Sequence, residues 1–245
     1  MKIIGVIPAR YNSSRLPGKP LVPLAGKPMI ERVWAQVRKA STLSGVVVAT
    51  DDERIVSAVK AFGGEAMLTR ADHRSGTERV AEVAVAHKDA DIFVNVQGDE
   101  PMIEPSAIDQ AVEALRDDEE VKVATLAVPI THAPDIMDPN VVKAVLDFDG
   151  NALYFSRAPI PWVRDRAGMA HARHLKHLGL YVYRREALLD FPTFPQGDLE
   201  RVEQLEQLRW LENGYRIRVA ETAHDSIGVD VPEDVARVEQ MLGRG

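Results

Sequence analysis

The stretch that decides the fold lies near the amino terminus, where residues 4–24 read IGVIPARYNSSRLPGKPLVPL. Its opening residues are apolar and rich in β-branched side chains, which is typical of a buried strand in a parallel sheet. The loop that follows carries Arg10, Arg15 and Lys19 among small hydrogen-bonding residues. Ligands of open α/β sheets bind beyond the carboxyl ends of the strands, where arginine and lysine can neutralise phosphate oxygens. The stretch therefore predicts a phosphate-binding loop, with a solvated basic loop as the alternative.

This loop lacks the two common phosphate-binding signatures. Lys19 follows Gly18, as in a P-loop, but Pro20 comes next in place of the serine or threonine that would hold magnesium. The turn after the first strand also lacks a G-x-G-x-x-G sequence. We therefore expect a nucleotide at this site to be held by side chains as well as by backbone amides.

Size and composition narrow the class of protein. The 245 residues, 45% of them apolar, suit a single domain, which we expect to span residues 1–245. The net charge of −7 argues against a general nucleic-acid binder. The absence of cysteine excludes disulfides and cysteine zinc sites, so we expect any metal to have oxygen ligands. No apolar stretch is long enough to cross a bilayer and no signal-peptide pattern is present, so we expect a cytoplasmic location.

Apolar strands alternate with amphipathic helices over the first 130 residues. The pattern predicts strands at residues 3–7, 45–50, 66–69, 92–97 and 123–130. It predicts helices at residues 28–40, from a cap at Asp51 or Asp52 to Gly63, at residues 75–87 and at residues 105–115. This alternation is typical of an α/β fold with a mostly parallel central sheet flanked by helices.

The pattern changes after that point. Two short strands at residues 141–146 and 152–156 are separated by a polar turn sequence, which predicts a hairpin. A further strand is expected at residues 177–183. We therefore predict an antiparallel insertion at residues 131–195, suited to binding a second substrate or to dimerisation.

The remaining residues are expected to return to helices and a strand. The leucine spacing predicts one continuous helix over residues 198–213, with Leu199 and Val202 facing inward. A half-exposed edge strand is expected at residues 215–219, and a last helix should begin at Pro232.

Two aspartates are candidate metal ligands. Asp99 follows the predicted strand at residues 92–97, at the sheet edge where a magnesium ion bridging phosphates would be held. Asp230, just before the last predicted helix, could supply a second carboxylate. The alternatives are that Asp99 belongs to a simple turn and that Asp230 complements the positive end of the helix.

Seven segments resemble those of one enzyme family, the 3-deoxy-manno-octulosonate cytidylyltransferases, also called CMP-KDO synthetases. In chain order they read IPARYNSSRLPGKPL, TRADHRSGTERVAE, VNVQGDEPMI, LYFSRAPIPW, HLGLYVYR, LEQLR and GVDVPED. They extend from Ile7 to Asp234, so the resemblance covers nearly the whole chain. It implies a Rossmann-like nucleotidyltransferase fold, a requirement for Mg²⁺, and a homodimer to which the antiparallel insertion contributes.

The resemblance also implies an activity and the residues that perform it. The activity is transfer of a cytidylyl group from CTP to KDO, giving CMP-KDO and pyrophosphate for lipopolysaccharide biosynthesis. Matching positions place Arg10, Arg15 and Lys19 at the triphosphate, Arg74, Ser75 and Gln97 at the cytidine, and Asp99 and Asp230 at Mg²⁺. Arg10, Lys19 and Asp99 are the implied catalytic residues. The sugar acid is assigned Arg157, His177, Tyr181, Glu206 and Gln207.

Several alternatives stay open at this point. Ser75 and Glu78 have the spacing of a capping box, which would explain that pair by helix formation alone. Glu206 and Gln207 would be solvated surface residues if they simply lie along a helix. The acceptor could be 8-amino-KDO or another sugar acid, and a non-catalytic nucleotide-binding regulator is the alternative from a different class. No residue stands out as a general base.

Overall fold

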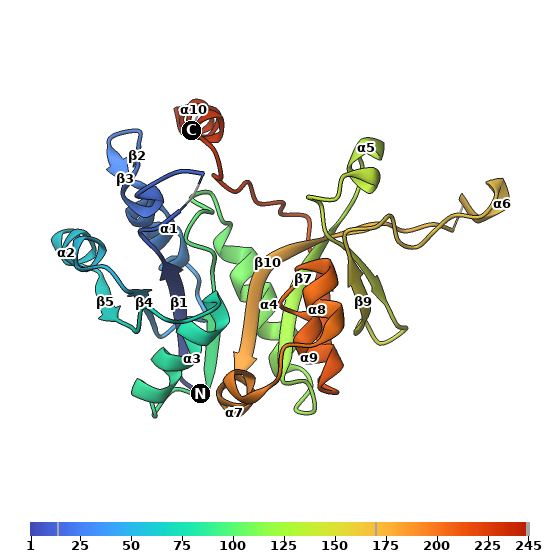
Figure 1. Cartoon of the computed structure of the whole chain (residues 1–245), viewed down its shortest axis with the longest axis horizontal. Coiled ribbons are helices and arrows are strands. Elements are labelled where there is room, and N and C mark those ends of the chain that lie inside the picture. The colour runs from blue at the N-terminus through green and yellow to red at the C-terminus, as the bar shows by residue number, and fades with distance from the viewer. Residues whose placement is uncertain (14, 170, 244–245) are drawn as a thin grey trace. The chain divides into compact units, whose positions relative to one another are not determined.

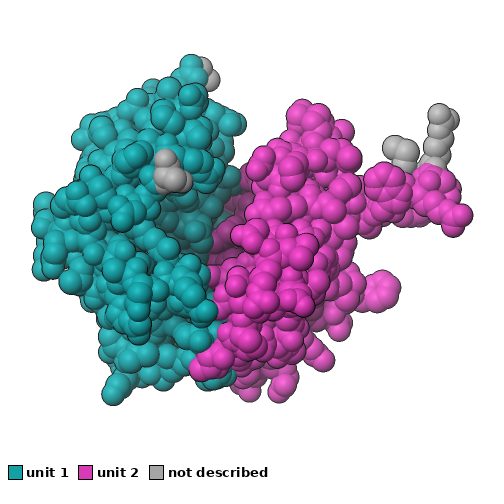
Figure 2. All heavy atoms as spheres, in the orientation of Figure 1, with its two compact units in different colours: residues 1–109, 182–192, 226–245 teal, residues 110–181, 193–225 magenta. Residues whose placement is uncertain are grey.

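The computed structural model describes residues 1–13, 15–169 and 171–243. The chain forms two compact units, which Figure 2 distinguishes by colour. Unit 1 comprises residues 1–109, 182–192 and 226–245, and unit 2 comprises residues 110–181 and 193–225. In the described part of the chain, no helix has the length and apolar character needed to span a membrane.

A parallel sheet forms the centre of unit 1. Its strands are β1 (Ile3–Ala9), β4 (Gly45–Thr50), β5 (Glu65–Leu68) and β6 (Ile92–Asn95), in the order β6-β1-β4-β5. Each neighbouring pair is parallel, with Ile4 of β1 opposite both Gly45 and Phe93. The predicted parallel arrangement is confirmed. Because all four strands run in one direction, the loops after β1 and β6 leave the sheet at the same edge.

The helices of unit 1 are α1 (Met29–Val37), α2 (Glu53–Ala61), α3 (Gly76–Ala86), the start of α4 (Pro105–Arg116), α7 (Arg185–Asp190) and α10 (Pro232–Leu242). Helices α1, α2 and α3 contact strands of this sheet, and α7 packs against α3. Figure 1 shows α1 and α3 alongside β1, which both helices contact. The apolar faces predicted from helical spacing are buried, including Ile30 and Val33 of α1.

The predicted helix starts are confirmed with one correction. Asp52 caps α2 by accepting a hydrogen bond from the backbone amide of Arg54 at 2.9 Å. Helix α1 begins at Met29, because Pro28 belongs to a short hairpin of β2 (Pro23–Leu24) and β3 (Lys27–Pro28). Before that hairpin, the short 3-10 helix η1 spans Lys19–Leu21.

Unit 2 contains both parallel and antiparallel strand pairs. Strand β7 (Val123–Pro129) pairs in parallel with β11 (Ile217–Glu221). Strands β8 (Lys143–Leu146) and β9 (Ala152–Ser156) form the predicted antiparallel hairpin, and β8 also pairs with β10 (Leu175–Arg184). The short helices α5 (Ala133–Met137) and α6 (Arg166–Met169) and the 3-10 helix η2 (Phe191–Thr193) were not predicted.

The helix predicted over residues 198–213 is wrong as a single element. The chain forms α8 (Asp198–Glu203) and α9 (Leu208–Glu212), separated by Gln204 with φ 53° and ψ 47°. The Arg157 guanidinium stabilises this break by donating to the backbone carbonyls of Glu203 at 2.8 Å and Gln204 at 3.3 Å. Leu199 and Val202, both predicted to face inward, are 42% and 83% exposed.

Candidate active site

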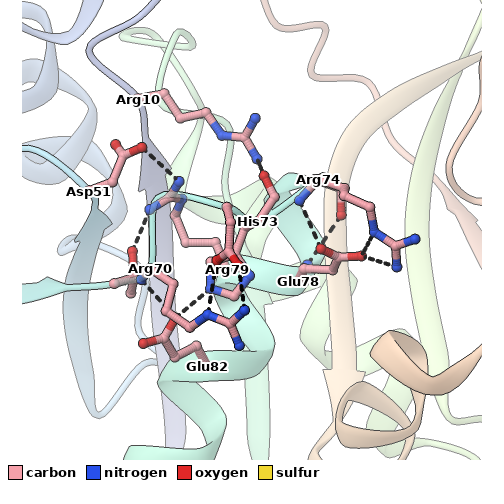
Figure 3. Close-up of polar contacts among 11 residues, drawn as sticks. Arg10, Asp51, Arg70, His73, Arg74, Glu78, Arg79 and Glu82 are labelled. Atoms are coloured by element: carbon pink, nitrogen blue, oxygen red, sulfur yellow. Dashed lines mark hydrogen bonds and ion pairs between the residues drawn. The ribbon is translucent and has the colours of Figure 1, made fainter.

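The loop that carries Arg10, Arg15 and Lys19, called the cationic loop below, begins at the carboxyl end of β1. Arg10, the first residue after the strand, extends toward the loop that precedes α3 (Figure 3). Its Nη2 atom donates a hydrogen bond to the backbone carbonyl of His73 at 2.7 Å. The His73 ring in turn pairs with the Glu82 carboxylate. Arg10 is therefore anchored to a neighbouring loop while its side chain stays at the surface.

Lys19 lies between the two aspartates that the sequence assigns to a metal. Its Nζ atom forms ion pairs with Asp99 and with Oδ1 of Asp230, the latter at 2.9 Å. Arg15 Nη2 donates to the same Asp230 oxygen at 3.1 Å. The structure thus brings the two acids together around one ammonium group, as expected from the sequence. Their role as metal ligands stays a prediction.

Backbone contacts explain why the two acids meet. The amide of Val229 donates to the carbonyl of Asp99 at 2.9 Å, which joins the loop after β6 to the segment before α10. Asp234, in the first turn of α10, accepts hydrogen bonds from the amides of Asp230 at 2.9 Å and Val231 at 3.1 Å. These bonds fix the direction in which the chain enters the helix, and with it the position of Asp230.

Gln97 and Gly98 lead the chain from β6 to Asp99. A Cβ atom at Gly98 would lie 2.8 Å from the backbone oxygen of Pro8, so only glycine allows the loop to pass this close to the end of β1. Gln97 is half-buried at the same edge of the sheet, and its predicted contact with the cytidine stays a prediction.

The charges around Lys19 are balanced. Burial acts to lower the pKa of Lys19, but attraction and hydrogen bonds from Asp99 and Asp230 outweigh it, so the pKa is raised. The side chain is therefore charged at neutral pH. Together with Arg15 it supplies two positive charges opposite two carboxylates. Such a cluster suits the joint entry of a divalent cation and a polyphosphate, whose charges are opposite.

Arg74 and Ser75 lie at the start of α3. Ser75 Oγ accepts a hydrogen bond from the amide of Glu78 at 3.2 Å, so the helix-capping role of Ser75 is confirmed. The buried Glu78 carboxylate also accepts from the Arg74 amide at 2.8 Å and from its Nε at 2.9 Å (Figure 3). These contacts give both residues a structural explanation, and their predicted role at the cytidine stays untested.

A buried arginine supports the same region from behind. Arg79 is fully buried in α3, where its guanidinium donates to Thr69 and lies 3.3 Å from an Asp51 oxygen (Figure 3). Burial lowers the pKa of Arg79, and the nearby Asp51 carboxylate opposes that shift. Through Asp51 and Thr69, Arg79 connects the end of β4 to the loop that carries His73. The carbonyl of His73 in that loop accepts the hydrogen bond from Arg10.

In unit 2, His177 lies in an aromatic cluster. Its ring packs edge-on against Phe155, with centroids 4.9 Å apart, and lies 5.3 Å from the ring of Tyr181. Burial lowers the pKa of His177 to about 3, so the ring is neutral at physiological pH. Although the residue keeps some solvent exposure, this environment disfavours the charged form.

The hydrogen bonds of Thr125 assign the tautomer of that ring. Thr125 Oγ1 lies 2.7 Å from the carbonyl of Leu180 and 3.1 Å from His177 Nε2. A hydroxyl has one proton, and a carbonyl can only accept, so the proton of Thr125 points to the carbonyl. His177 Nε2 must then be the donor, which makes Nδ1 an acceptor.

The other predicted sugar residues surround the break between α8 and α9. Arg157 donates to three backbone carbonyls, those of Glu203 and Gln204 and that of Pro139 at 2.9 Å. Its guanidinium is therefore partly committed to holding the chain, a use that the sequence did not reveal. Glu206 and Gln207 lie within the break and not along one helix.

Comparison with known proteins identifies the family. A family model described as Cytidylyltransferase matches residues 4–217. The 3-deoxy-manno-octulosonate cytidylyltransferase of Solibacter usitatus is 54% identical over 98% of this chain and 94% of its own length. That of Geobacter metallireducens is 52% identical over 100% of this chain and 99% of its own length. The chain belongs to the 3-deoxy-manno-octulosonate cytidylyltransferases.

Solved structures agree with this family. CMP:2-keto-3-deoxy-manno-octonic acid synthetase, solved in complex with CTP, matches 100% of this chain and 99% of its own with a TM-score of 0.94 and 46% identity. A 4-diphosphocytidyl-2C-methyl-D-erythritol synthase from Anaerococcus prevotii matches with a TM-score of 0.65 at 14% identity, which shows a shared fold alone. The predicted nucleotidyltransferase fold of this family is therefore confirmed.

In this cytidylyltransferase, the residues that the sequence missed are those that hold others in place. His73 accepts the hydrogen bond that anchors Arg10, and Arg79 pairs with Asp51 behind the loop that carries His73. Glu78, which the sequence indicated only as part of a capping box, also holds Arg74. Local spacing carries little signal for such contacts. A charged residue on the apolar face of a predicted helix, as Arg79 is in α3, was the available clue.

Asp99 and Asp230 are the residues of this family member that could hold a metal. Among the described residues, no group of three or more histidines or acids gathers in a way that could bind an ion. Two carboxylates nevertheless fit Mg²⁺, which usually takes one or two carboxylates and completes its shell with water and substrate phosphates. The carboxylate oxygens of both aspartates already face the positive charge of Lys19, so they are suitable ligands for a metal cation.

Proposed function

We propose that the CTP-dependent cytidylyltransferase activity of this chain proceeds by direct in-line attack of a KDO hydroxyl on the α-phosphate of CTP. The new bond joins the sugar oxygen to the α-phosphorus. The bond from that phosphorus to the oxygen shared with the β-phosphate breaks, and pyrophosphate leaves with its electron pair. The hydroxyl proton passes to solvent, because no side chain of the described site stands out as its acceptor. CMP-KDO is the activated sugar used for lipopolysaccharide biosynthesis.

The observation that carries this proposal is the position of Lys19 between Asp99 and Asp230. Phosphoryl transfer needs the reacting groups to be positioned and the charge that develops on the leaving group to be neutralised. Lys19 can turn from the two carboxylates to the β- and γ-phosphates when the nucleotide enters. Arg10, at the end of β1, and Arg15 supply further positive charge for the triphosphate.

We assign Mg²⁺ to Asp99 and Asp230. When bound, the ion supplies charge neutralisation for the α-phosphate and helps to align it. Asp99 is held by its backbone contact with Val229, and Asp230 by the start of α10, so both ligands are positioned before the substrates bind. Binding to pre-positioned carboxylates avoids the cost of ordering them at the moment of reaction.

The cytidine is assigned to Arg74, Ser75 and Gln97. Ser75 and Arg74 lie at the amino end of α3, where backbone amides face outward, and Gln97 follows β6. Gln97 presents both donor and acceptor groups, which can distinguish the edge of cytosine from that of uracil. Support for this assignment is the matching of these positions to the family's segments.

The sugar acid is assigned to Arg157, His177, Tyr181, Glu206 and Gln207 of unit 2. His177 is neutral, with Nδ1 as an acceptor, so it suits a sugar hydroxyl and not a carboxylate. Within the described part of the chain, the buried Nε2 of Gln207 has no hydrogen-bond partner, so it is a donor available to a ligand. Of the five residues assigned to the sugar acid, Arg157 is the one with a positive charge, so we assign the sugar carboxylate to it.

A pyrophosphate-release assay tests the proposed substrates. Each of the four common nucleoside triphosphates is combined in turn with KDO and with its 8-amino analogue. We expect release with CTP and KDO and little with UTP, ATP or GTP. Faster turnover with 8-amino-KDO would favour the alternative acceptor, and CTP hydrolysis without product formation would contradict the transfer reaction. No release with any sugar acid would favour the nucleotide-binding regulator.

We also propose that the enzyme is a homodimer and acts in the cytoplasm, where CTP is available. Unit 2 exposes large apolar side chains at Phe148, Leu153 and Trp162, with 63% or more of each accessible. Exposed apolar groups of this size often mark a protein interface. Light scattering should give a dimer mass for the native chain and a smaller mass for Phe148→Glu. A monomeric native chain would contradict this proposal.

A further inference from the structure

Tyr11, the neighbour of Arg10 in the cationic loop, has no part in the assignments above. The guanidinium carbon of Arg54 lies over its ring, 3.3 Å from the ring centroid. Arg54 belongs to the first turn of α2, the helix after β4. The contact therefore joins the loop after β1 to the start of α2, through a cation on an aromatic face.

Arg54, whose side chain is 59% exposed, is held in this position by Asp52. Its Nε and Nη2 atoms donate to the two oxygens of Asp52 at 2.9 and 2.6 Å. Asp52 is itself fixed because it caps α2, accepting from the Arg54 amide. A two-point pair of this kind sets the plane of the guanidinium, which a lysine ammonium could not reproduce.

The same tyrosine also contacts Gly18, at the other end of the loop. The Gly18 amide donates to the Tyr11 carbonyl at 3.1 Å. Gly18 has a φ of +69°, and a Cβ atom there would lie 3.3 Å from both Cζ and Oη of Tyr11. Gly18 directly precedes Lys19 and η1. Tyr11 thus closes the loop at the point where the chain presents Lys19.

We propose that Tyr11 and Arg54 form a clamp that holds the cationic loop in the conformation that binds the triphosphate, and that neither residue contacts the nucleotide. This inference rests on the proposed binding of the triphosphate by Arg10 and Lys19. A loop that is ordered before binding loses less conformational entropy when the ligand arrives. Tyr11 and Arg54 are therefore positioning residues that act through Arg10 and Lys19.

A double-mutant cycle separates this clamp from direct contact. Tyr11→Ala, Arg54→Ala and the double variant are compared by calorimetric titration with CTP and by steady-state kinetics. Each single change should weaken CTP binding about tenfold and raise KM for CTP, with kcat and KM for KDO within about twofold of the native values. The double variant should lose no more than either single one, since one clamp is broken in all three. Multiplied effects, about a hundredfold in total, would overturn the proposal.

Conservative variants and a matched control complete the test. Tyr11→Phe keeps the ring and should bind CTP as the native chain does, whereas Arg54→Lys keeps the charge but should behave like Arg54→Ala. Native affinity in Arg54→Lys would show that charge alone is sufficient and would overturn the proposal. Arg116→Ala is the control, because Arg116 is an exposed arginine paired with Glu113 at 2.8 Å. It should leave CTP binding unchanged.

Lys19→Gln distinguishes failure of the clamp from failure of the proposed function. If the native chain binds CTP and Lys19→Gln weakens it while Tyr11→Ala does not, only the clamp is wrong. If the native chain and Lys19→Gln bind CTP equally, the triphosphate assignment is wrong and the clamp with it. Thermal unfolding of each variant should change by a similar small amount, so that affinity losses cannot be attributed to unfolding.

Discussion

Replacing Lys19 with glutamine should make the nucleotide-free protein bind Mn²⁺ more tightly. In the structure, the Lys19 ammonium occupies the position between Asp99 and Asp230 that a divalent ion would share. An ion that enters must either displace this ammonium or be repelled by it. Removing the ammonium removes both costs, while the two carboxylates stay in place.

The magnitude follows from the less costly of these two routes. An ammonium that stayed about 4 Å from a divalent ion would repel it by about 2 kcal/mol even in the dielectric of water. An ammonium that leaves gives up its ion pairs. The side chains of Asp99 and Asp230 are 30% and 47% exposed, and pairs exposed to this extent contribute about 1 kcal/mol. We therefore expect Mn²⁺ binding about fivefold tighter in Lys19→Gln.

Electron paramagnetic resonance of free Mn²⁺ measures this change without any turnover. Lys19→Arg serves as the control, because it keeps a positive charge near the two carboxylates and should gain no affinity. Asp230→Asn in the Lys19→Gln background should lose the gain. Equal Mn²⁺ affinity in the native chain and in Lys19→Gln would refute the idea that the lysine and the metal share one position, as would a gain that survives loss of Asp230.

Three further changes test other parts of the structure. Asp99→Asn should lower Mg²⁺-dependent turnover by about a hundredfold or more with an unchanged circular dichroism spectrum, and near-normal activity would exclude a metal role. Because burial lowers the pKa of His177 to about 3, the unfolded chain takes up its proton first as the pH falls. The contribution of His177 to the free energy of unfolding should thus be complete above pH about 6.5 and decline as the pH falls toward 3. The decline is at most about 1.4 kcal/mol per pH unit, and it is smaller than this because the side chain is partly exposed to solvent. Urea unfolding of His177→Gln should show a weaker loss on acidification, and an equal loss would contradict this. Glu200→Gln should destabilise unit 2 by about 3–5 kcal/mol, because Arg209, bonded to Glu200 at 2.7 and 2.6 Å, is left buried without its charge partner. Adding Arg209→Met should restore part of that loss.

The sheet of unit 1 was predictable because its signals are local. Strand β4 has the bounds expected from its apolar run, and Asp52, one of the two aspartates expected to cap α2, is the cap. The meeting of Asp99 with the cationic loop was also predictable, because parallel strands bring the loops at their carboxyl ends to one edge. Asp230 was placed there from a position just before a helix and from the family resemblance.

The break at Gln204 could not be predicted in the same way. Leucine spacing across residues 198–213 fits one helix, and nothing local marks a left-handed residue at position 204. The conformation depends on Arg157, which is distant in sequence and donates to the backbone carbonyls of Glu203 and Gln204 at the break. A hydrogen bond of this kind exists only once the chain has folded.

The sequence by itself determined where the strands and helices of unit 1 lie and which charged groups gather at the carboxyl edge of its sheet. Those features follow from periodicity, capping and strand direction, which act between residues close in the chain. Only the tertiary structure decided that Lys19 stands between Asp99 and Asp230, that Arg54 covers Tyr11, and that His177 is neutral. These depend on distances and burial between elements far apart in sequence, which folding alone establishes.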